Sequence, residues 1–373
     1  MSQQASRTLR IAVIPGDGIG QEVVPEGIRV LDRLAALSEG RFSFEYEEFP
    51  WGCQYYQQTG RMIDEAALET LKQFEAIFFG AVGWPGVPDH ISLWGLRLAI
   101  CQGFDQYVNI RPVQLLPGVQ SPLRNATREN IDWIVVRENS EGEYAGIGGR
   151  NLSGRGRGKE IAIQAGLFTE EGCERVIRYA FNLALTRKRK KVTSVTKSNA
   201  QQYGMVLWDE VFHRVSQEFP GVETEQWLVD AMAARFVLRP DTLEVVVASN
   251  LFADILSDLG SALAGSLGIA ASANLNPEGR YPSMFEPVHG SAPDIAGQGI
   301  ANPIAQIWSA ALMLDHLGLP GEAAAIMAAI ERVTAAGTLT PDLGGTCSTR
   351  DVTDAILAAL TDGQQQAQPV PAR

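Results

Sequence analysis

Strand patterns and helix patterns alternate along almost the whole chain, and this alternation constrains the fold more than any single motif. Short apolar runs typical of buried strands include residues 9–14, 42–49, 76–82, 161–167 and 245–248, and segments with apolar residues at helical spacing lie between them. Strands that alternate with helices favour a layered α/β architecture. With 373 residues, the chain is long enough for two domains, or for one large domain split by an insertion.

The first strand pattern ends in a turn that contains three glycines. Residues 15–20 read Pro-Gly-Asp-Gly-Ile-Gly, and a helix pattern follows at 21–34. A strand, a glycine turn and a helix in this order are typical of dinucleotide-binding Rossmann folds. The spacing here is GxGxG, however, and the Rossmann fingerprint requires GxGxxG. We therefore interpret the segment as a tight turn that leads into a helix.

Two aspartates on one predicted helix are candidate metal ligands. A helix pattern at 251–259 follows the apolar run 245–248, and Asn250 is predicted to be its N-cap. Asp254 and Asp258 are four residues apart, so they lie on one face of this helix, where like charges repel by about a few tenths of a kcal/mol. A divalent cation between them would reverse the sign of that interaction. The residues alone leave open whether the pair binds a metal or is solvated.

An irregular segment downstream is rich in residues that form turns. Residues 285–303 carry Glu286, His289 and Asp294 among many small side chains. Loops of this composition expose backbone amides that a ligand can approach closely. We therefore expect a ligand-binding loop here.

Three basic side chains lie at the ends of predicted strands. Arg111 and Arg137 each follow an apolar run, and Lys197 lies near the end of the strand pattern at 191–199. A single arginine at such a place is commonly a surface ion pair, but two arginines with fork geometry suit bidentate binding of carboxylates. A desolvated lysine can act as a base, although an exposed lysine is the more common case.

The charge of the chain argues against two classes of partner. The net charge is −12, which disfavours binding to nucleic acid and to anionic membranes. The basic segment 187–191 lies between a helix pattern and a strand pattern, so we interpret it as a solvated turn.

The cysteines and the N-terminus indicate a reducing compartment. Cys53, Cys101, Cys173 and Cys347 lie far apart without a CxxC pair, which argues against disulfides and structural zinc. We find no signal peptide and no segment long enough to span a membrane, so we predict a cytoplasmic protein.

Several segments together resemble the β-decarboxylating dehydrogenases, the family of isopropylmalate, isocitrate, homoisocitrate and tartrate/D-malate dehydrogenases. They are IPGDGIG (14–20), FDQYVNIRP (104–112), VVRENSEGEY (135–144), TKSNA (196–200), NLFADILSDLG (250–260) and FEPVHGSAPDIAG (285–297). GAVGWP (80–85), PDHISLWG (88–95) and SANLNPE (272–278) are most similar to the tartrate/D-malate branch.

The resemblance implies a fold and an assembly. The fold would be an isopropylmalate dehydrogenase-like arrangement of two open α/β domains, not a Rossmann fold. Residues 1–106 and 265–373 would form the first domain, on the cofactor side. Residues 107–264 would form the second, with an arm at about 145–168 that makes an arm-type dimer interface. The assembly would be a homodimer or a dimer of dimers with shared active sites.

The resemblance also implies roles for individual residues. Asp254 and Asp258, with Asp230 of the partner subunit, would bind Mg²⁺ or Mn²⁺, and a monovalent cation such as K⁺ is a further candidate. Lys197, also from the partner, would be the general base, and Tyr144 the general acid. The substrate would be bound by Arg111, Arg137, Trp94 and Arg97. Residues expected to bind the cofactor are Asn199 and Glu286 near the nicotinamide, and Gly268, His289, Gly290, Ser291, Ala292, Asp294, Ile295 and Asn302 near the adenosine. Asp294 would accept from the ribose hydroxyls and repel a 2′-phosphate, which favours NAD over NADP.

One position departs from the family pattern. The family usually has a third carboxylate-binding arginine where this chain has Cys101, and a thiol cannot replace a guanidinium fork. Arg97 lies one helical turn earlier, in the segment 91–101 whose apolar residues have helical spacing. We expect Arg97 to supply the lost charge from a shifted position.

The implied activity is NAD- and metal-dependent oxidation of a 2-hydroxy acid with a 3-carboxylate, followed by decarboxylation to a 2-oxo acid. D-malate or tartrate is the preferred substrate. A 3-isopropylmalate or an isocitrate- or homoisocitrate-like acid stays open as an alternative, because Leu93 and Trp94 suggest a pocket closed to long polar groups whereas Arg97 could accept another carboxylate. An alternative of another class is a non-catalytic regulatory subunit, which only Cys101 favours.

Overall fold

The chain is described by a computed structural model that covers residues 7–151 and 158–367 and divides into two compact units. The first unit comprises residues 1–106, 114–128 and 261–373, and the second comprises 107–113 and 129–260. The segment 114–128 groups with the first unit, whereas the predicted second domain ran without a break from 107 to 264. Ser121 Oγ donates to the Leu263 carbonyl at 2.6 Å, and Arg128 forms an ion pair with Glu331, which ties this segment to later parts of the first unit.

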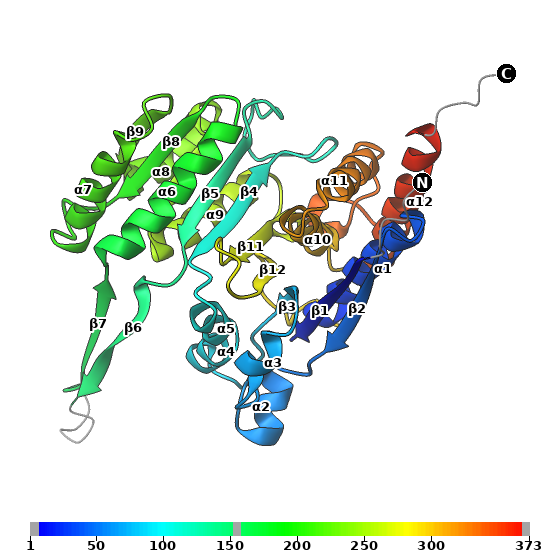
Figure 1. Cartoon of the computed structure of the whole chain (residues 1–373), viewed down its shortest axis with the longest axis horizontal. Helices are drawn as coiled ribbons and strands as arrows, with labels where there is room; N and C mark the ends of the chain where they lie inside the picture. Colours follow the sequence, from blue (N-terminus) through cyan, green and yellow to red (C-terminus); the bar gives the residue numbers. More distant parts are fainter. Residues whose placement is uncertain (1–6, 152–157, 368–373) are drawn as a thin grey trace. The chain divides into compact units, whose positions relative to one another are not determined.

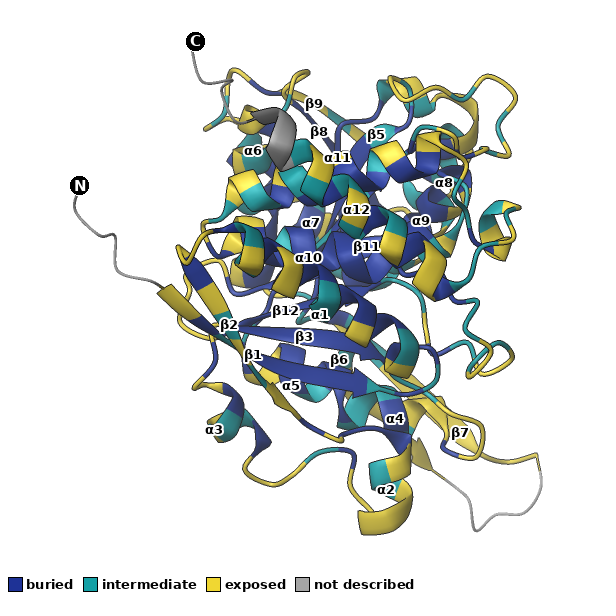
Figure 2. Cartoon of the chain, turned by 90° about the vertical axis from the view of Figure 1, so that its right-hand side faces the viewer, coloured by how far each residue is buried: buried dark blue, intermediate teal, exposed yellow. Residues whose placement is uncertain are grey.

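The first unit contains a mostly parallel sheet with strand order β2-β1-β3-β12-β11 (Figure 1). β1 pairs in parallel with β2 and β3, β3 pairs in parallel with β12, and β12 is antiparallel to β11. The bounds are β1 Arg7–Gly16, β2 Phe42–Glu48, β3 Ala76–Ala81, β11 Ala271–Leu275 and β12 Ser283–Pro287. β3, β11 and β12 are buried over their whole length (Figure 2), as expected for strands covered on both faces.

Helices of the first unit carry both its core and several predicted site residues. They are α1 Gly20–Leu37, α2 Cys53–Thr59, α3 Ala67–Leu71, α4 Asp89–Gly95, α5 Arg97–Gly103, α10 Ile304–His316, α11 Pro320–Ala335 and α12 Thr349–Ala367, with short 3-10 turns η3 Leu267–Ile269 and η4 Pro341–Leu343. The predicted helical segment 91–101 is not continuous. It breaks at Leu96, where φ is −123° and ψ is −77°, so that Arg97 starts a separate helix. Arg97 and Cys101 are still one turn apart within α5.

Within the second unit, the strand order is β4-β5-β10-β8-β9. The strands are β4 Val108–Gln114, β5 Asp132–Glu138, β8 Lys191–Thr196, β9 Glu223–Leu228 and β10 Val245–Ala248. Its helices are α6 Glu170–Thr186, α7 Gly204–Ser216, α8 Val229–Leu238 and α9 Asn250–Leu263, with the 3-10 turn η2 Pro240–Thr242. β5, β10, β8 and β9 are parallel neighbours, so their carboxyl ends meet at one edge, where ligands of open α/β sheets usually bind.

Two strands of the second unit form a separate two-stranded antiparallel ribbon. They are β6 Gly142–Asn151 and β7 Ile161–Leu167. The ribbon exposes the apolar side chains of Ile147, Ile161 and Ile163, the last of them 66% exposed. The predicted arm at about 145–168 corresponds to this ribbon, except that residues 152–157 lie outside the described part of the chain.

Ion pairs neutralise the basic segment 187–191. Arg187 pairs with Asp132 and Glu244, both at 2.8 Å, and Lys191 pairs with Glu223 at 3.1 Å. The segment is therefore held within the second unit and does not form a free basic patch. In the described ranges, none of the helices has the length and apolar character that a membrane span requires.

Candidate active site

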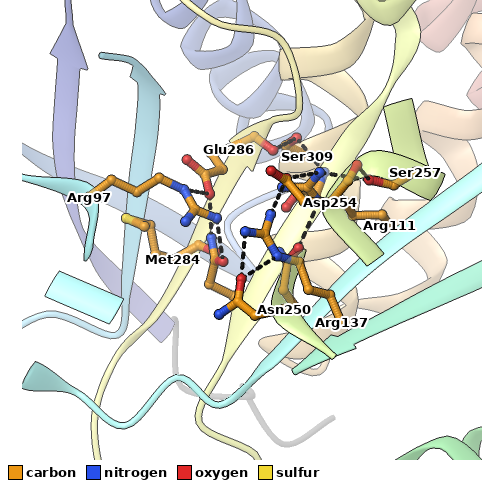
Figure 3. A network of polar contacts seen from close by, with 12 residues as sticks. Arg97, Arg111, Arg137, Asn250, Asp254, Ser257, Met284, Glu286 and Ser309 are labelled. Atoms are coloured by element: carbon orange, nitrogen blue, oxygen red, sulfur yellow. Dashed lines mark hydrogen bonds and ion pairs between the residues drawn. The ribbon is translucent and has the colours of Figure 1, made fainter. Parts of the chain in front are cut away.

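Two buried arginines of the second unit converge on one carboxylate (Figure 3). Arg137, at the end of β5, contacts Asp254 through Nη1, and Arg111 on β4 donates from Nη1 to Asp254 Oδ1 at 3.1 Å. The Arg111 and Arg137 side chains are 7% and 3% exposed, whereas that of Asp254 is 33% exposed. Buried guanidinium groups beside a half-exposed carboxylate form a positive site that an acidic ligand could reach.

Neighbouring side chains fix both guanidinium groups in place. Arg137 donates from Nε and Nη2 to Asn250 Oδ1 at 2.9 and 2.7 Å. Arg111 donates from Nε to Asn109 Oδ1 and from Nη1 to Ser257 Oγ, both at 2.7 Å. The predicted N-cap role of Asn250 is wrong, because Asn250 is already the first residue of α9 and its side-chain oxygen accepts from Arg137. Its amide oxygen thus orients an arginine.

Asp254 and Asp258 lie one turn apart on α9, as the spacing predicted. Burial raises the pKa of Asp258 above its usual range, and the charge of Asp254 adds to this effect, while Arg111 at 3.8 Å opposes it. A cation beside the two carboxylates would relieve the cost of their ionisation, so their chemistry fits a hard divalent ion. Within residues 7–151 and 158–367, no group of three or more His, Cys, Asp or Glu side chains could hold a metal.

Tyr144 is a neighbour of this carboxylate pair. Its hydroxyl lies 3.3 Å from Asp254 Oδ2, and the Arg137 guanidinium lies 5.4 Å from the centre of its ring. Tyr144 is thus placed at the same cluster as both arginines.

Lys197 and Asp230 form a second polar pair in the same unit. Lys197 follows β8, Asp230 lies in the first turn of α8, and Nζ and Oδ1 are 2.5 Å apart. The hydrogen bond from Lys197 lowers the pKa of Asp230. Within one chain Asp230 does not join Asp254 and Asp258 in a metal cluster.

In the first unit, the glycine turn after β1 packs against the predicted ligand loop. Ile19 N donates to the Ser291 carbonyl at 2.9 Å. Gly18 has a φ of +56°, and a Cβ there would lie 2.0 Å from the Ser291 oxygen. The turn therefore needs glycine for close backbone contact, which confirms its interpretation as a tight turn. Ala292 has a φ of +40°, so the ligand loop is also tightly bent.

A cavity of about 620 Å³ opens beside this loop. Its lining comes from the segment after β3 and from the loop itself: Val82, Gly83, Trp84, Pro85, Gly86, Val87, Pro88, Asp89, Gly290, Ser291 and Pro293. Small residues and backbone predominate, which allows close approach by an extended ligand. Two predicted cofactor-binding residues thus lie on its wall.

His289 precedes this wall and presents an unsatisfied nitrogen. Its Nδ1 lies 2.9 Å from the Gly290 carbonyl oxygen, and its buried Nε2 has no hydrogen-bond partner among the described residues. Burial lowers the pKa of His289, so the ring is neutral at pH 7. A buried polar atom without a partner suits a ligand that supplies one.

Asp342 connects two further predicted cofactor residues. Its carboxylate accepts from Asn302 Nδ2 at 3.1 Å and from Ser266 Oγ at 2.5 Å, and Ser266 Oγ accepts from Gly268 N at 2.9 Å. The other residues expected near the adenosine are placed less tightly: Asp294 is exposed and Ile295 is half-buried.

Asp17 was missed by the sequence analysis, and it shapes the cavity wall. This buried carboxylate accepts from Cys53 N at 2.8 Å and from Gly83 N at 2.9 Å, so it joins the glycine turn to α2 and to the segment after β3. No spacing rule marks Asp17, since both of its donors are backbone amides from distant segments.

The remaining predicted residues are distributed as follows. Glu286 and Arg97 pair in the first unit, with Nε and Oε1 2.7 Å apart. Trp94 is half-buried on α4, and Asn199 is exposed after β8. The structure brings together Arg111, Arg137, Tyr144, Asp254 and Asp258 in one unit and the residues of the 286–302 loop in the other.

Comparisons with known proteins extend over nearly the whole chain. A family model described as isocitrate/isopropylmalate dehydrogenase matches residues 10–356. A probable tartrate dehydrogenase/decarboxylase of Agrobacterium vitis is 57% identical over 354 residues, covering 95% of this chain and 98% of its own length. The D-malate dehydrogenase [decarboxylating] of Escherichia coli (strain K12) is 53% identical over 357 residues, covering 94% and 98%.

A solved structure is also similar to this chain. The crystal structure of isocitrate dehydrogenase from Methylococcus capsulatus superposes with a TM-score of 0.84 at 33% identity, covering 94% of this chain and 99% of that one. The fold predicted from the motifs and the likeness to the tartrate/D-malate branch are thereby confirmed.

Proposed function

The chain belongs to the isocitrate/isopropylmalate dehydrogenase family, and on that premise we propose that it oxidises D-malate or tartrate with NAD and decarboxylates the product to a 2-oxo acid. Its relatives at 53% and 57% identity carry the names D-malate and tartrate dehydrogenase, both decarboxylating. The observation that carries the proposal is the convergence of Arg111, Arg137 and Tyr144 on Asp254, because two guanidinium groups and a phenol beside a carboxylate suit acid binding, proton transfer and metal binding.

The acid would be bound by the two arginines of the second unit. Arg111 and Arg137 are rigidly held by Asn109, Ser257 and Asn250, so little side-chain entropy is lost on binding. Two fixed guanidinium groups suit the two carboxylates of a malate core.

The metal would be Mg²⁺ or Mn²⁺, held by Asp254 and Asp258 together with Asp230 of the partner subunit. When bound, the metal would stabilise negative charge on the C2 oxygen, and NAD would accept the hydride from C2. The donor set fits because the two carboxylates of α9 stand next to each other, and burial of Asp258 disfavours its charge when no cation is near.

The chain's own residues would move two protons. Lys197 of the partner subunit would take the proton of the C2 hydroxyl, because its amine is the basic group supplied there. After hydride transfer, the C3 carboxylate is β to a ketone and leaves as CO₂, and its bonding electrons pass to C3. Tyr144 would then give its proton to C3.

The cofactor would be NAD, bound in the first unit. The cavity beside Gly290 and Ser291 and the unsatisfied Nε2 of His289 fit a dinucleotide. Asp294 would accept from both ribose hydroxyls, and its charge would repel the 2′-phosphate of NADP.

The active enzyme would be a homodimer, in which Asp230 of the partner subunit completes the metal site of Asp254 and Asp258. Support comes from the exposed apolar side chains of the β6–β7 ribbon and from Leu238 and Ile255, which are 74% and 58% exposed on α8 and α9. Large exposed apolar side chains on several elements of one unit are typical of an interface between subunits.

A panel of acids tests the activity. The purified protein is mixed with NAD, Mn²⁺ and either D-malate, tartrate, 3-isopropylmalate or isocitrate, and NADH and the 2-oxo acid are both measured. NADH formation with D-malate or tartrate, and its loss with a chelator, is expected. Turnover confined to isopropylmalate or isocitrate, or no turnover with any acid, would contradict the proposal.

Mixed dimers test the shared site. Lys197→Met and Asp254→Asn proteins should each be inactive, but a refolded equal mixture should regain roughly a quarter of wild-type activity, since half of the dimers would have one intact site. A mixture that stays inactive, while wild-type protein refolds under the same conditions, would mean that Lys197 and Asp254 act within one chain.

A further inference from the structure

A buried ring of hydrogen bonds links Arg97, Glu286 and Asn274 in the first unit, and Figure 3 shows Arg97 directed at Glu286. Arg97 Nε donates to Glu286 Oε1 at 2.7 Å, and Arg97 Nη2 donates to Asn274 Oδ1 at 3.1 Å. Asn274 Nδ2 donates to the same Glu286 oxygen at 2.7 Å. Arg97 is 7% exposed, Glu286 is 5% exposed and Asn274 is fully buried. The three side chains therefore fix one another.

The surrounding backbone holds this ring in place. Glu286 is on β12 and Asn274 is on the neighbouring antiparallel strand β11. Ser309 Oγ on α10 donates to the Glu286 carbonyl at 2.8 Å. Arg97 is the first residue of α5 because the helical segment breaks at Leu96. The guanidinium thus reaches Glu286 from a separate, short helix.

Cys101 has a different environment although it lies only one turn further along α5. Its side chain is fully buried within the apolar core that includes Leu96, Ile100 and Phe104. A thiol in such a core behaves as a small apolar group. Position 101 thus carries a thiol and not a guanidinium group, and Arg97 pairs with Glu286.

We infer that Arg97 is a positioning residue on the cofactor side, which holds the Glu286 carboxylate in place for the nicotinamide end of NAD. This inference rests on the proposed function and on the role near the nicotinamide that the family resemblance implies for Glu286. Removing the guanidinium would leave a buried carboxylate without its cation, so Glu286 would change its position or take up a proton. Either change would alter cofactor binding first.

The two roles considered for Arg97 predict different kinetics. If Arg97 positions Glu286, Arg97→Met should raise KM for NAD by about tenfold or more and change KM for the acid by less than about twofold. NADH binding without acid, followed by its fluorescence, should weaken in the same proportion. Arg97→Lys should recover part of the loss, because an ammonium group keeps the charge but not the fork.

A double-mutant cycle tests the link to Glu286. Glu286→Gln in the Arg97→Met background should weaken NADH binding much less than it does in the wild type, because the two residues act through one contact. Arg128→Met, which removes an exposed ion pair with Glu331 in the same unit, is the control for loss of an arginine. Thermal unfolding shows which variants are folded.

Three results would overturn the inference. One is an increase in KM for the acid with unchanged NADH binding, which would make Arg97 an acid-binding residue. The second is full additivity of the effects of Arg97→Met and Glu286→Gln on NADH binding. The third is NADH binding by folded Arg97→Lys and Arg97→Met proteins that equals that of the wild type. If no acid is turned over at all, the proposed substrate fails, and the NADH titrations still decide the role of Arg97.

Discussion

Arg137 and Asn250 are joined by a forked contact, in which Nε and Nη2 of the arginine both donate to one amide oxygen, at 2.9 and 2.7 Å. This contact leaves Nη1 of Arg137 directed at Asp254. Asn250, at the start of α9, therefore orients the positive charge of Arg137 at the end of β5. A lysine can reproduce the charge at this position but not the geometry.

Arg137→Lys should therefore reduce kcat/KM for the acid by about tenfold to a hundredfold, which corresponds to roughly 1.4–2.7 kcal/mol of lost transition-state stabilisation. Steady-state kinetics with saturating NAD measures this change. The matched control is Arg178→Lys, whose ion pairs with Glu174 and Glu218 lie at the surface of the same unit. An equal loss in both variants would argue against a specific role for the Arg137 fork.

His289 should make NADH binding dependent on pH in one direction. Burial lowers the pKa of His289 below about 6.5, the usual pKa of a histidine. The histidine of the folded protein therefore stays neutral at pH 6.5 and is protonated only at lower pH. The unfolded chain binds this proton at higher pH than the folded one, so the contribution of His289 to stability is full at neutral pH and is lost as pH falls below about 6.5. NADH affinity should fall at lower pH than stability does, when the histidine of the folded protein takes up the proton.

Fluorescence titrations of NADH between pH 8 and pH 5.5 would measure this, with a fall of up to about tenfold per pH unit once the histidine is protonated. In His289→Gln, the decrease of NADH affinity with falling pH should be smaller. An unchanged slope in that variant would assign the pH dependence to other groups.

Gly268→Ala should weaken cofactor binding. A Cβ at this position would lie 2.6 Å from Asp342 Oδ2 and 2.9 Å from Asn302 Cβ, so Asp342 or Asn302 must move. We expect a loss of stability of about 1–3 kcal/mol, as for overpacked sites, together with weaker NADH binding. Chemical denaturation and NADH titration measure the two effects.

The control for Gly268→Ala is Gly321→Ala on α11, where an added Cβ would meet nothing within 4 Å. That substitution should leave NADH binding unchanged and stabilise the fold by up to about 1 kcal/mol, because alanine is the better helix former. Intact NADH binding in Gly268→Ala would show that the 266–268 turn does not contribute to the cofactor site.

Thiol labelling should distinguish Cys347 from the other cysteines. Burial raises the pKa of Cys53 and of Cys173 to about 12, and the carboxylate of Asp17 adds to the effect at Cys53. Cys101 is fully buried, whereas Cys347 is partly exposed. Iodoacetamide at pH 8 should modify Cys347 alone in the folded protein and all four cysteines after unfolding, as mass spectrometry would show. Rapid labelling of Cys53 or Cys173 in folded protein would contradict the burial of these thiols.

The family, the alternation of strands and helices, and the positions of Asp254 and Asp258 on one helix face all follow from the amino-acid sequence without coordinates. Each of these properties depends either on residues close together in the chain or on several motifs taken together. Helical spacing places residues four apart on one face whatever surrounds them, and several long motifs together are specific without any coordinates. The tight turn at residues 15–20 could be recognised for the same reason, since the glycine spacing alone excluded the dinucleotide fingerprint.

The partner that each polar group takes could not be read from the sequence and depends on how distant segments pack together. Asn250 orients Arg137 and does not cap a helix, Arg97 pairs with Glu286, and Asp17 joins three segments through backbone amides. Each of these contacts links residues at least 36 positions apart. A hydrogen bond forms only when the donor–acceptor distance is correct to within about a few tenths of an ångström. That precision is set by the packing of the whole unit and not by the spacing of residues along the chain.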